Sequence, residues 1–427
     1  MAGTDLKISQ LPSLTTLNMV DIIPINDAGT TESISVQNLF TQALITGIQI
    51  TGMAVIGKIV GGRVSNVGAG NAATGLYAGT LAGQTNTARG TNTAIAGGAN
   101  NNAITNSSFI GAGASNTIRG DWNFIGAGTI NETSGDYSFC GAGFGNTADG
   151  TEVSIVGGES NAAFGSYGFI GGGNGNTLRA SSPVIVGGAS NKNSGDYGFI
   201  GAGQSNQIDP TADWSNIVGG SSNTIRGTYN SIGGGRLNTI PDGSISYATI
   251  CGGLSNSIED LISPYGTVPP TYGFIGGGTS NSIRFGDAAF IGGGSDNMAS
   301  GLYCSVVGGY NNRTLNNNSV ILGGAYNFVS GSYAMVFGHG CETKLNGASV
   351  FGGTETTRKK YAYRNDSLCI NFSGGMLISG GRLCMDTLVA PASSTAAGRL
   401  GEIAIDTSYV YVCTSLNTWK RVALSSF

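Results

Sequence analysis

The chain has 427 residues, of which 74 are glycine, 40% are hydrophobic and only 10% are charged. So much glycine without a three-residue period excludes collagen, and the hydrophobic content argues against disorder. A net charge of −4 provides no basic surface for nucleic acid. No stretch is long and apolar enough to span a membrane, and the first residues lack the pattern of a signal peptide.

The cysteines are odd in number and follow no metal-like spacing. We expect them to be small buried hydrophobic residues of a protein made in a reducing compartment, with neither metal nor cofactor. They are Cys140, Cys251, Cys304, Cys341, Cys369, Cys384 and Cys413.

Residues 1–50 contain two short predicted strands, 21–25 and 31–36. An Ile-Ser-Gln-Leu-Pro sequence (8–12) precedes them, and an apolar run (39–45) follows. This order resembles the N-terminal segment of bacteriophage tail fibres and tail spikes. The resemblance implies that residues 1–50 attach the protein to other tail or baseplate proteins of the virion.

Residues 51–357 are copies of one motif, Ile-Gly-Gly-Gly-x-Ser-Asn. The asparagine recurs every 15 residues from Asn71 to Asn206, and some later copies contain short insertions. Glu342 and Thr356 occupy the next two expected asparagine positions. A fixed period of this size predicts one coil of a stacked structure per copy. We therefore expect an elongated all-β solenoid of about 19 coils, with small β-rich domains at both ends.

Six residues before each asparagine lies an aliphatic residue, which predicts a short strand whose inner face stacks on neighbouring coils. This ladder includes Ile110, Ile125, Ile155, Ile170, Ile185 and Ile200. Asparagine and glycine are expected in turns because both tolerate a positive φ, and stacked asparagines can hydrogen-bond along the axis. The second ladder includes Asn116, Asn131, Asn146, Asn161, Asn176, Asn191 and Asn206.

On the outer face of the predicted strand, a large residue at one position accompanies a small residue two positions away. Phe109 is followed by Gly111, whereas Ser154 is followed by Val156. This packing predicts that another chain covers the outer face. The repeats resemble the left-handed trimeric β-roll heads of trimeric autotransporter adhesins, which implies a homotrimer. An intertwined triple-β shaft, which advances much further per repeat, is the alternative.

An aromatic residue lies nine positions before the asparagine in many copies. We expect these rings to stack along the axis, with sugar-stacking platforms as the alternative role for a few of them. They are Tyr77, Trp122, Tyr137, Tyr167, Tyr197, Trp214, Tyr229, Tyr247, Tyr272, Tyr303 and Tyr333.

Residues 358–394 form a predicted neck with a basic cluster, and residues 395–427 alternate as an antiparallel meander. The meander is similar to a small module that ends many phage tail fibres. We expect this tip to meet the host first, and Tyr265 in the longest repeat insertion competes with it as a contact to a host surface glycan or protein. The candidate tip residues are Tyr409, Tyr411, Trp419, Lys420 and Arg421.

No catalytic set is predicted. The single histidine, His339, is expected in a turn, and Glu259, Asp260, Asp287 and Asp296 are expected to be solvated loop residues. The sequence thus favours a bacteriophage tail fibre, assembled in the host cytoplasm, that attaches the virion without catalysis. The alternatives are a tail spike that cleaves surface polysaccharide in a groove between subunits, and a bacterial trimeric adhesin.

Overall fold

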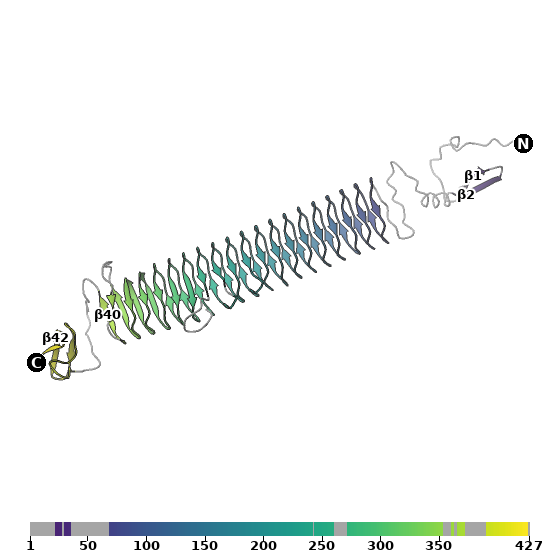
Figure 1. Ribbon diagram of the computed structural model, residues 1–427. Helices are drawn as coiled ribbons and strands as arrows, with labels where there is room; N and C mark the ends of the chain where they lie inside the picture. Colours follow the sequence, from purple (N-terminus) through teal and green to yellow (C-terminus); the bar gives the residue numbers. More distant parts are fainter. Residues whose placement is uncertain are drawn as a thin grey trace. The chain divides into compact units, whose positions relative to one another are not determined.

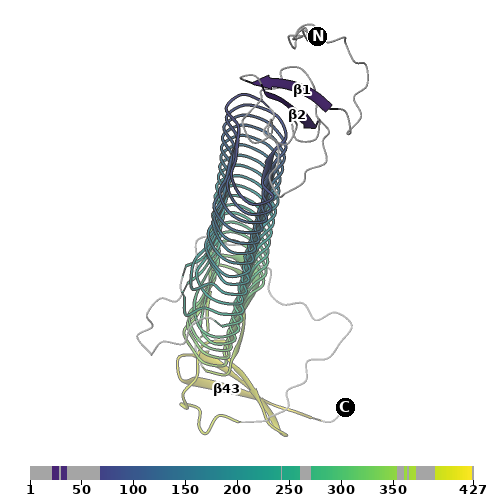
Figure 2. The ribbon, with the colours of Figure 1, turned by 90° about the vertical axis from the view of Figure 1, so that its right-hand side faces the viewer.

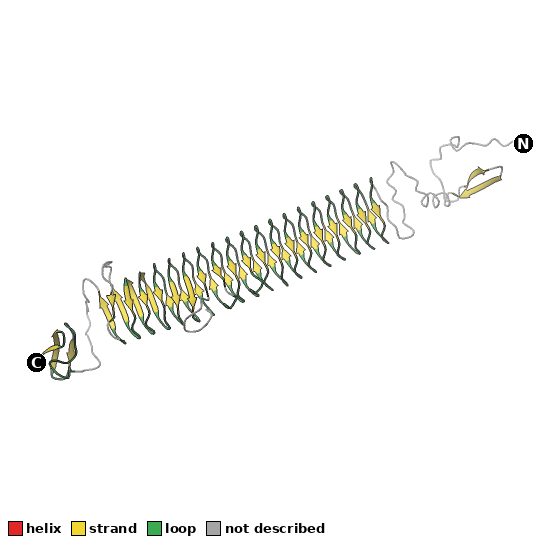
Figure 3. Cartoon of the chain, in the orientation of Figure 1, coloured by secondary structure: helices red, strands yellow, loops and turns green. Residues whose placement is uncertain are grey.

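The structure is a computed structural model that describes residues 22–27, 30–35, 68–241, 243–259, 271–352, 360–362, 365–371 and 390–425. The chain divides into two units, Met1–Gly62 and Arg63–Phe427. Strands and turns make up the described residues, which contain no helix (Figure 3). No helix that could cross a membrane is therefore found among them.

The N-terminal unit contains one β-hairpin. Strand β1 (Ile22–Asp27) pairs antiparallel with β2 (Thr30–Ser35), so that Ile23 lies opposite Ile34. The two strands predicted in this segment are confirmed. The predicted opening (8–12) and apolar run (39–45) lie outside the described residues.

The repeats form a β-solenoid of about 18 turns (Figures 1 and 2), as the 15-residue period predicts. Each coil contributes two short strands, and each strand pairs in parallel with the equivalent strand of the next coil. This parallel pairing within one chain excludes the triple-β shaft. The even-numbered stack contains β4 (Gly79–Thr80), β6 (Ala94–Ile95), β8 (Phe109–Ile110), β10 (Phe124–Ile125), β12 (Phe139–Cys140), β14 (Ser154–Ile155), β16 (Phe169–Ile170), β18 (Val184–Ile185), β20 (Phe199–Ile200), β22 (Asn216–Ile217), β24 (Ser231–Ile232), β26 (Thr249–Ile250), β28 (Phe274–Ile275), β30 (Phe290–Ile291), β32 (Ser305–Val306), β34 (Val320–Ala325), β36 (Met335–His339), β38 (Ser349–Gly352) and β40 (Leu368–Asn371).

The second strand of each coil begins directly after the asparagine and was not predicted from the sequence. Its signal is an aliphatic or small residue two positions after the asparagine, as at Ile118, Leu178 and Ile208. This odd-numbered stack contains β3 (Ala72–Ala73), β5 (Thr87–Ala88), β7 (Asn102–Ala103), β9 (Thr117–Ile118), β11 (Glu132–Thr133), β13 (Thr147–Ala148), β15 (Ala162–Ala163), β17 (Thr177–Leu178), β19 (Lys192–Asn193), β21 (Gln207–Ile208), β23 (Thr224–Ile225), β25 (Thr239–Ile240), β27 (Ser257–Ile258), β29 (Ser282–Phe285), β31 (Met298–Ser300), β33 (Arg313–Thr314), β35 (Phe328–Val329), β37 (Cys341–Thr343) and β39 (Lys360–Tyr361).

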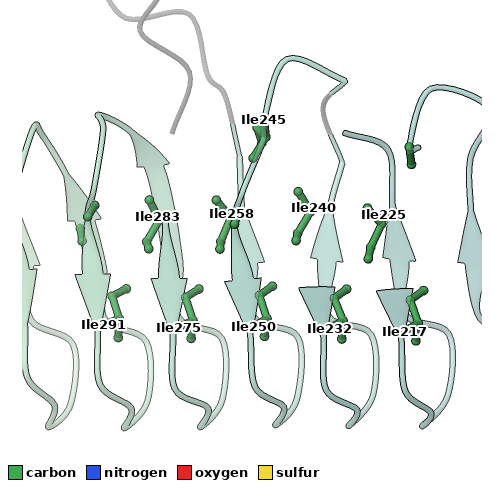
Figure 4. Packing of buried hydrophobic residues seen from close by; sticks show 14 of the residues in the cluster. Ile217, Ile225, Ile232, Ile240, Ile245, Ile250, Ile258, Ile275, Ile283 and Ile291 are labelled. Carbon is green, nitrogen blue, oxygen red and sulfur yellow. The ribbon is translucent and has the colours of Figure 1, made fainter. Parts of the chain in front are cut away.

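The two stacks enclose a hydrophobic core inside one chain. Figure 4 shows two rows of isoleucines between the stacks, one row from each strand of the coil. All six isoleucines of the predicted ladder are fully buried, and each buried side chain contributes roughly 1.5–3 kcal/mol. Because the core is closed without a partner chain, a trimer is not needed to complete it.

The asparagine ladder is confirmed. Asn161 Oδ1 accepts hydrogen bonds from Asn176 N (3.0 Å) and Asn176 Nδ2 (3.1 Å). Asn161 Nδ2 lies 3.0 Å from the carbonyl oxygens of Gly157 in its own coil and Gly173 in the next. Each such amide thus links its own coil to the next, and the anchor asparagines from Asn86 to Asn327 are buried.

The turns confirm the expected positive φ for glycine but not for the asparagine. The residue before the asparagine, such as Ser160, has the positive φ, and the asparagine itself does not. Three positions before the asparagine lies a glycine such as Gly128 (φ 98°), where a Cβ would collide with the carbonyl oxygen of Gly143.

The ladder ends at Cys341, whose N–H donates to Asn327 Oδ1 at 2.9 Å, so Glu342 does not replace an asparagine. Thr356 lies outside the described residues.

The cysteines are only partly as expected. Cys140, Cys304, Cys341 and Cys413 are buried, but Cys251 is exposed, because it lies on the outer face of the even-numbered stack. Burial raises the pKa of the Cys140 thiol to about 12, as expected for an inert structural cysteine. Cys384 and most of the predicted neck lie outside the described residues.

Strands β41 (Ile403–Ile405), β42 (Tyr409–Ser415) and β43 (Thr418–Ala423) form an antiparallel meander, as predicted. Trp419 Nε1 donates a hydrogen bond to the carbonyl oxygen of Ala396 at 3.1 Å. This bond ties the segment before β41 to the sheet, so residues 396–423 form one small folded unit.

Replacing one ladder asparagine tests the architecture. Asn161→Ala leaves the amide groups of Asn176 without their acceptor, which should lower the free energy of unfolding by roughly 1–3 kcal/mol per chain. Asn174→Ala is the matched control, because Asn174 is exposed and its side chain hydrogen-bonds to Glu159. The effect of this substitution should stay within about 0.5 kcal/mol.

Ile170→Asp should be far more disruptive than either substitution, because it places an unpaired charge in the core. Thermal and denaturant unfolding would measure all three variants. If Asn161→Ala and Ile170→Asp both unfold like the parent protein, the assignment of the interior is wrong.

Candidate functional site

The aromatic residues nine positions before the asparagine lie in one turn of each coil. We call this column, from Tyr77 to Tyr333, the aromatic edge. Its residues all have φ between 50° and 62°. For a bulky L-residue this left-handed backbone costs on the order of 1–2 kcal/mol. The residues of the aromatic edge adopt this conformation on the protein surface.

Five rings of the aromatic edge form a continuous stack, as predicted. Ring centroids are 4.0 Å apart between Tyr197 and Trp214, and 6.5 Å apart between Trp214 and Tyr229. Tyr247 lies 5.0 Å from Tyr229 and 5.3 Å from Tyr272. Such pairs gain about 0.5–1.5 kcal/mol each, which offsets the backbone cost within the stack.

Outside this stack, Trp122 and Tyr137 also stack, with ring centroids 6.2 Å apart, whereas Tyr167 and Tyr303 are separated from other rings by gaps. Glu152 and Ser182 flank Tyr167 in the column, and Ala288 and Asn318 flank Tyr303. Rings beside a gap are the more exposed ones: the exposed fraction is 57% for Tyr303 and 71% for Tyr333, against 48% for Tyr229 and Tyr247. The faces of the isolated rings are open to solvent.

All insertions between Asn206 and Asn297 fall in the turn that leads to the aromatic edge. Asparagine hydrogen bonds connect residues 17 apart at Asn206–Asn223, 18 at Asn238–Asn256, 25 at Asn256–Asn281 and 16 at Asn281–Asn297. In these coils, the segment from the strand of the even-numbered stack to the asparagine has the same length in every copy. Insertions confined to one side of a solenoid are a common property of a binding face.

Aspartates precede several residues of the aromatic edge. Asp196 Oδ1 accepts the N–H of Ser181 at 2.8 Å, and Asp213 Oδ1 accepts the N–H of Asp196 at 2.9 Å. Asp121 and Asp136 repeat the arrangement, with a distance of 2.8 Å from Asp121 N to Asp136 Oδ1. These carboxylates bind the backbone of the preceding coil and so hold the turns that present the rings.

The tip brings most of its predicted residues together. Tyr409, Tyr411, Trp419 and Arg421 share one face of the sheet, since Arg421 pairs with Tyr411 and Trp419 with Cys413. The Arg421 guanidinium lies 4.1 Å from the centre of the Tyr409 ring. Lys420 lies on the opposite face, where it pairs with Val412, so it does not join this group. Tyr265 lies outside the described residues.

Asp406 completes the tip group and was missed in the sequence. Tyr411 Oη donates to Asp406 Oδ2 at 2.7 Å, and the N–H groups of Ser408 and Tyr409 donate to Asp406 Oδ1 at 2.7 Å. The Tyr411 hydrogen bond is the main reason that the pKa of Asp406 lies below its ordinary value of 3.8, and it raises the pKa of Tyr411. The sequence Asp-Thr-Ser-Tyr (406–409) is typical of a tight turn in which the aspartate side chain accepts backbone hydrogen bonds. This pattern is the sequence signal for the role of Asp406.

A second exposed surface is the outer face of the even-numbered stack, which we call the apolar face. Phe109, Phe124 and Phe139 stack on it, with centroids 5.6 and 5.4 Å apart. Phe124 is 39% exposed and Val156 is 49% exposed. The outward residues of the odd-numbered stack are mostly polar instead, among them Thr147, Thr177 and Lys192.

The histidine and the four acidic residues that were expected to have no catalytic role lie in different surroundings. His339 ends strand β36 rather than a turn, and its Nδ1 is buried without a hydrogen-bond partner. Asp287 lies in a turn and is partly exposed, but its Oδ1 is buried and unpaired. Asp296 is exposed, Glu259 accepts a hydrogen bond from Ser257, and Asp260 lies outside the described residues. Over the described ranges, no group of three or more His, Cys, Asp or Glu residues could hold a metal ion.

Two bacteriophage proteins are similar to short parts of this chain. A 41-residue stretch, 10% of this chain and 5% of the relative, is 58% identical to "Depolymerase 1, capsule K30/K69-specific" of Klebsiella phage K5-2. A 76-residue stretch, 18% of this chain and 9% of the relative, is 32% identical to "Depolymerase, capsule K30/K69-specific" of Klebsiella phage K64-1. No family model matches the chain. These matches and the β-solenoid confirm the predicted resemblance to bacteriophage tail fibres and tail spikes.

The matches contradict one prediction. Both relatives are named as depolymerases, which are enzymes, whereas the sequence analysis favoured a fibre without catalysis. Composition and motifs could not reveal this, because carboxylates that act across a groove have no fixed spacing in the sequence.

The Asp406 group makes a prediction about the tip. Because the pKa of Asp406 is lowered in the folded state, its hydrogen bonds contribute stability above the ordinary aspartate pKa. That stability is lost as the pH falls through the lowered value. Tyr411→Phe removes the bond that lowers the pKa of Asp406 most, so the tip of this variant should open at a higher pH than the parent tip.

Pepsin digestion at a series of acidic pH values, with mass spectrometry of residues 390–425, would measure this difference. Tyr409→Phe is the control, because it leaves the bond between Tyr411 and Asp406 in place. Equal opening curves for Tyr411→Phe and the parent would show that this bond does not hold the tip.

Proposed function

We propose that this chain is part of a bacteriophage tail spike that binds a polysaccharide of the host surface and cleaves it. The observation that carries the proposal is the 58% identity to a phage capsule depolymerase, although the chain spans only 5% of that relative's length. The aromatic edge supports a sugar ligand, because exposed tyrosine and tryptophan rings combine an apolar face with a polar tip. A location on the virion follows from the same proposal.

Cleavage by hydrolysis would use two carboxyl groups, roughly 5–10 Å apart according to the stereochemical outcome. The solenoid presents carboxylates at its turns, including Glu152, Asp196 and Asp213. A groove between subunits would bring carboxylates of two chains together.

Incubation with purified capsular polysaccharides and lipopolysaccharide O-chains tests the activity. The intact protein should lower the viscosity of one of them and release new sugar ends, and heat-denatured protein should not. Binding of a polysaccharide without any release of sugar ends would contradict the enzymatic part of the proposal.

We also propose that three copies assemble through the apolar face, and that residues 1–50 attach the trimer to other tail proteins. The apolar face supports this assembly, because large exposed apolar patches mark interaction sites. Identical repeats also allow phenylalanines of one copy to meet the glycine positions of another.

The assembly can be tested by replacing residues on the apolar face. Sedimentation of the intact protein should show a trimer with negligible monomer. Phe124→Asp combined with Phe139→Asp should dissociate it, because the substitutions place three pairs of charges in the interface. Thr147→Asp, on the outward face of the odd-numbered stack, should leave the trimer intact. A folded monomer of the parent protein at micromolar concentration would contradict the assembly.

A further inference from the structure

The backbone conformation of the aromatic edge does not require aromatic residues. All 17 positions from Tyr77 to Tyr333 have the left-handed conformation, which glycine and asparagine adopt most readily. Asn92, Ser107 and Asn318 occupy the column without changing its φ. In the positive-φ column directly before the ladder asparagine, serine is the most frequent residue, as at Ser115, Ser160 and Ser190. Fold alone therefore gives no reason for rings at the aromatic edge.

Stacking explains only part of the column. The rings between Tyr197 and Tyr272 have aromatic neighbours on adjacent coils, but Tyr167 and Tyr303 have none within the described solenoid. Both side chains are more than half exposed, so burial does not compensate either. A bulky residue in a strained conformation, neither buried nor stacked, points to a function.

From this combination we propose that Tyr167 and Tyr303 are sugar-contacting residues, and that the gaps beside them are subsites for single sugar units of an extended polysaccharide. This inference rests on the proposed function and places its binding site. In each gap, two rings of equivalent position lie two coils apart, or roughly 9.6 Å at the usual β spacing. Aromatic pairs stack at about 4.5–7 Å, so neither ring can cover the other, and a sugar ring can lie between them.

The chemistry of the gaps fits a sugar. The carbon–hydrogen face of a sugar ring packs against an aromatic face, while its hydroxyl groups need hydrogen-bond partners at the rim. Glu152, Ser182 and Asn318 lie in the gaps and supply acceptors and donors. A few polar groups beside apolar surfaces provide orientation and specificity in most ligand sites.

The pattern also favours a polymer over a free sugar. Gaps lie on both sides of Tyr167 and on both sides of Tyr303, and the stack from Tyr197 to Tyr272 separates the two groups. A single sugar would occupy one gap weakly. A long chain running along the aromatic edge would bind several gaps at once, and linked weak contacts give high combined affinity.

The test uses the full-length protein and the double variant Tyr167→Asn with Tyr303→Asn. Asparagine is chosen because Asn92 and Asn318 already occupy this column. The matched control is Tyr326→Asn, since Tyr326 is also an exposed tyrosine with φ 56° but lies in the other turn of the coil, directly before Asn327. The probe is the purified polysaccharide that the parent protein retains in native affinity electrophoresis on a panel of capsular polysaccharides and O-chains.

The double variant should bind this polysaccharide at least about tenfold more weakly, equivalent to about 1.4 kcal/mol, and its Tm should equal or exceed that of the parent. If the rings had only a structural role, removing them would not raise the stability while lowering the affinity. Tyr326→Asn should keep the affinity of the parent, and Tyr167→Phe should restore most of the affinity lost at that position.

Unchanged affinity in the double variant would overturn the inference and leave the proposed function standing. An equal loss of affinity in Tyr326→Asn would also overturn it. If the parent protein retains no polysaccharide of the panel, both the proposed function and this inference fail.

Discussion

The structure depends on hydrogen bonds that pass from each coil to the next at one fixed position. The ladder asparagine accepts from the backbone and side chain of its successor, and donates to carbonyl oxygens of two coils. Isoleucine burial supplies most of the stabilisation, but it is not directional. The amide ladder specifies the register, because a coil displaced by one residue would leave buried amide groups unpaired.

The parts of the fold that repeat in the sequence could be predicted from it. The 15-residue period, the isoleucine ladder and the asparagine ladder are visible because the same residue type recurs at the same position. The second strand was missed because alanine, threonine, isoleucine and leucine alternate two positions after the asparagine, as at Ala103, Thr133 and Leu178. Inside a narrow coil such residues pack equally well, so no single type marks the position.

The functional site was predicted less completely, for physical reasons that differ between its parts. The stacked rings were expected, but the distinction between stacked and isolated rings needs the conformation of the turn, which the sequence does not display. At the tip, alternation along two strands placed Tyr409, Tyr411 and Arg421 correctly, whereas Asp406 acts through a turn outside that alternation. Catalysis was not predicted, because carboxylates that act across a groove follow no periodic pattern, and it was suggested by the names of the two phage relatives.

The insertions have a consequence for how such a protein changes over generations. One half of each coil, from the even strand through the asparagine, keeps a constant length, while the turn before the aromatic edge accepts additional residues without disturbing the ladder. Mutation can therefore alter the turn before the aromatic edge while the inherited frame stays the same. New surface chemistry can thus arise in one coil at a time, without a change in the ladders that hold the other coils in register.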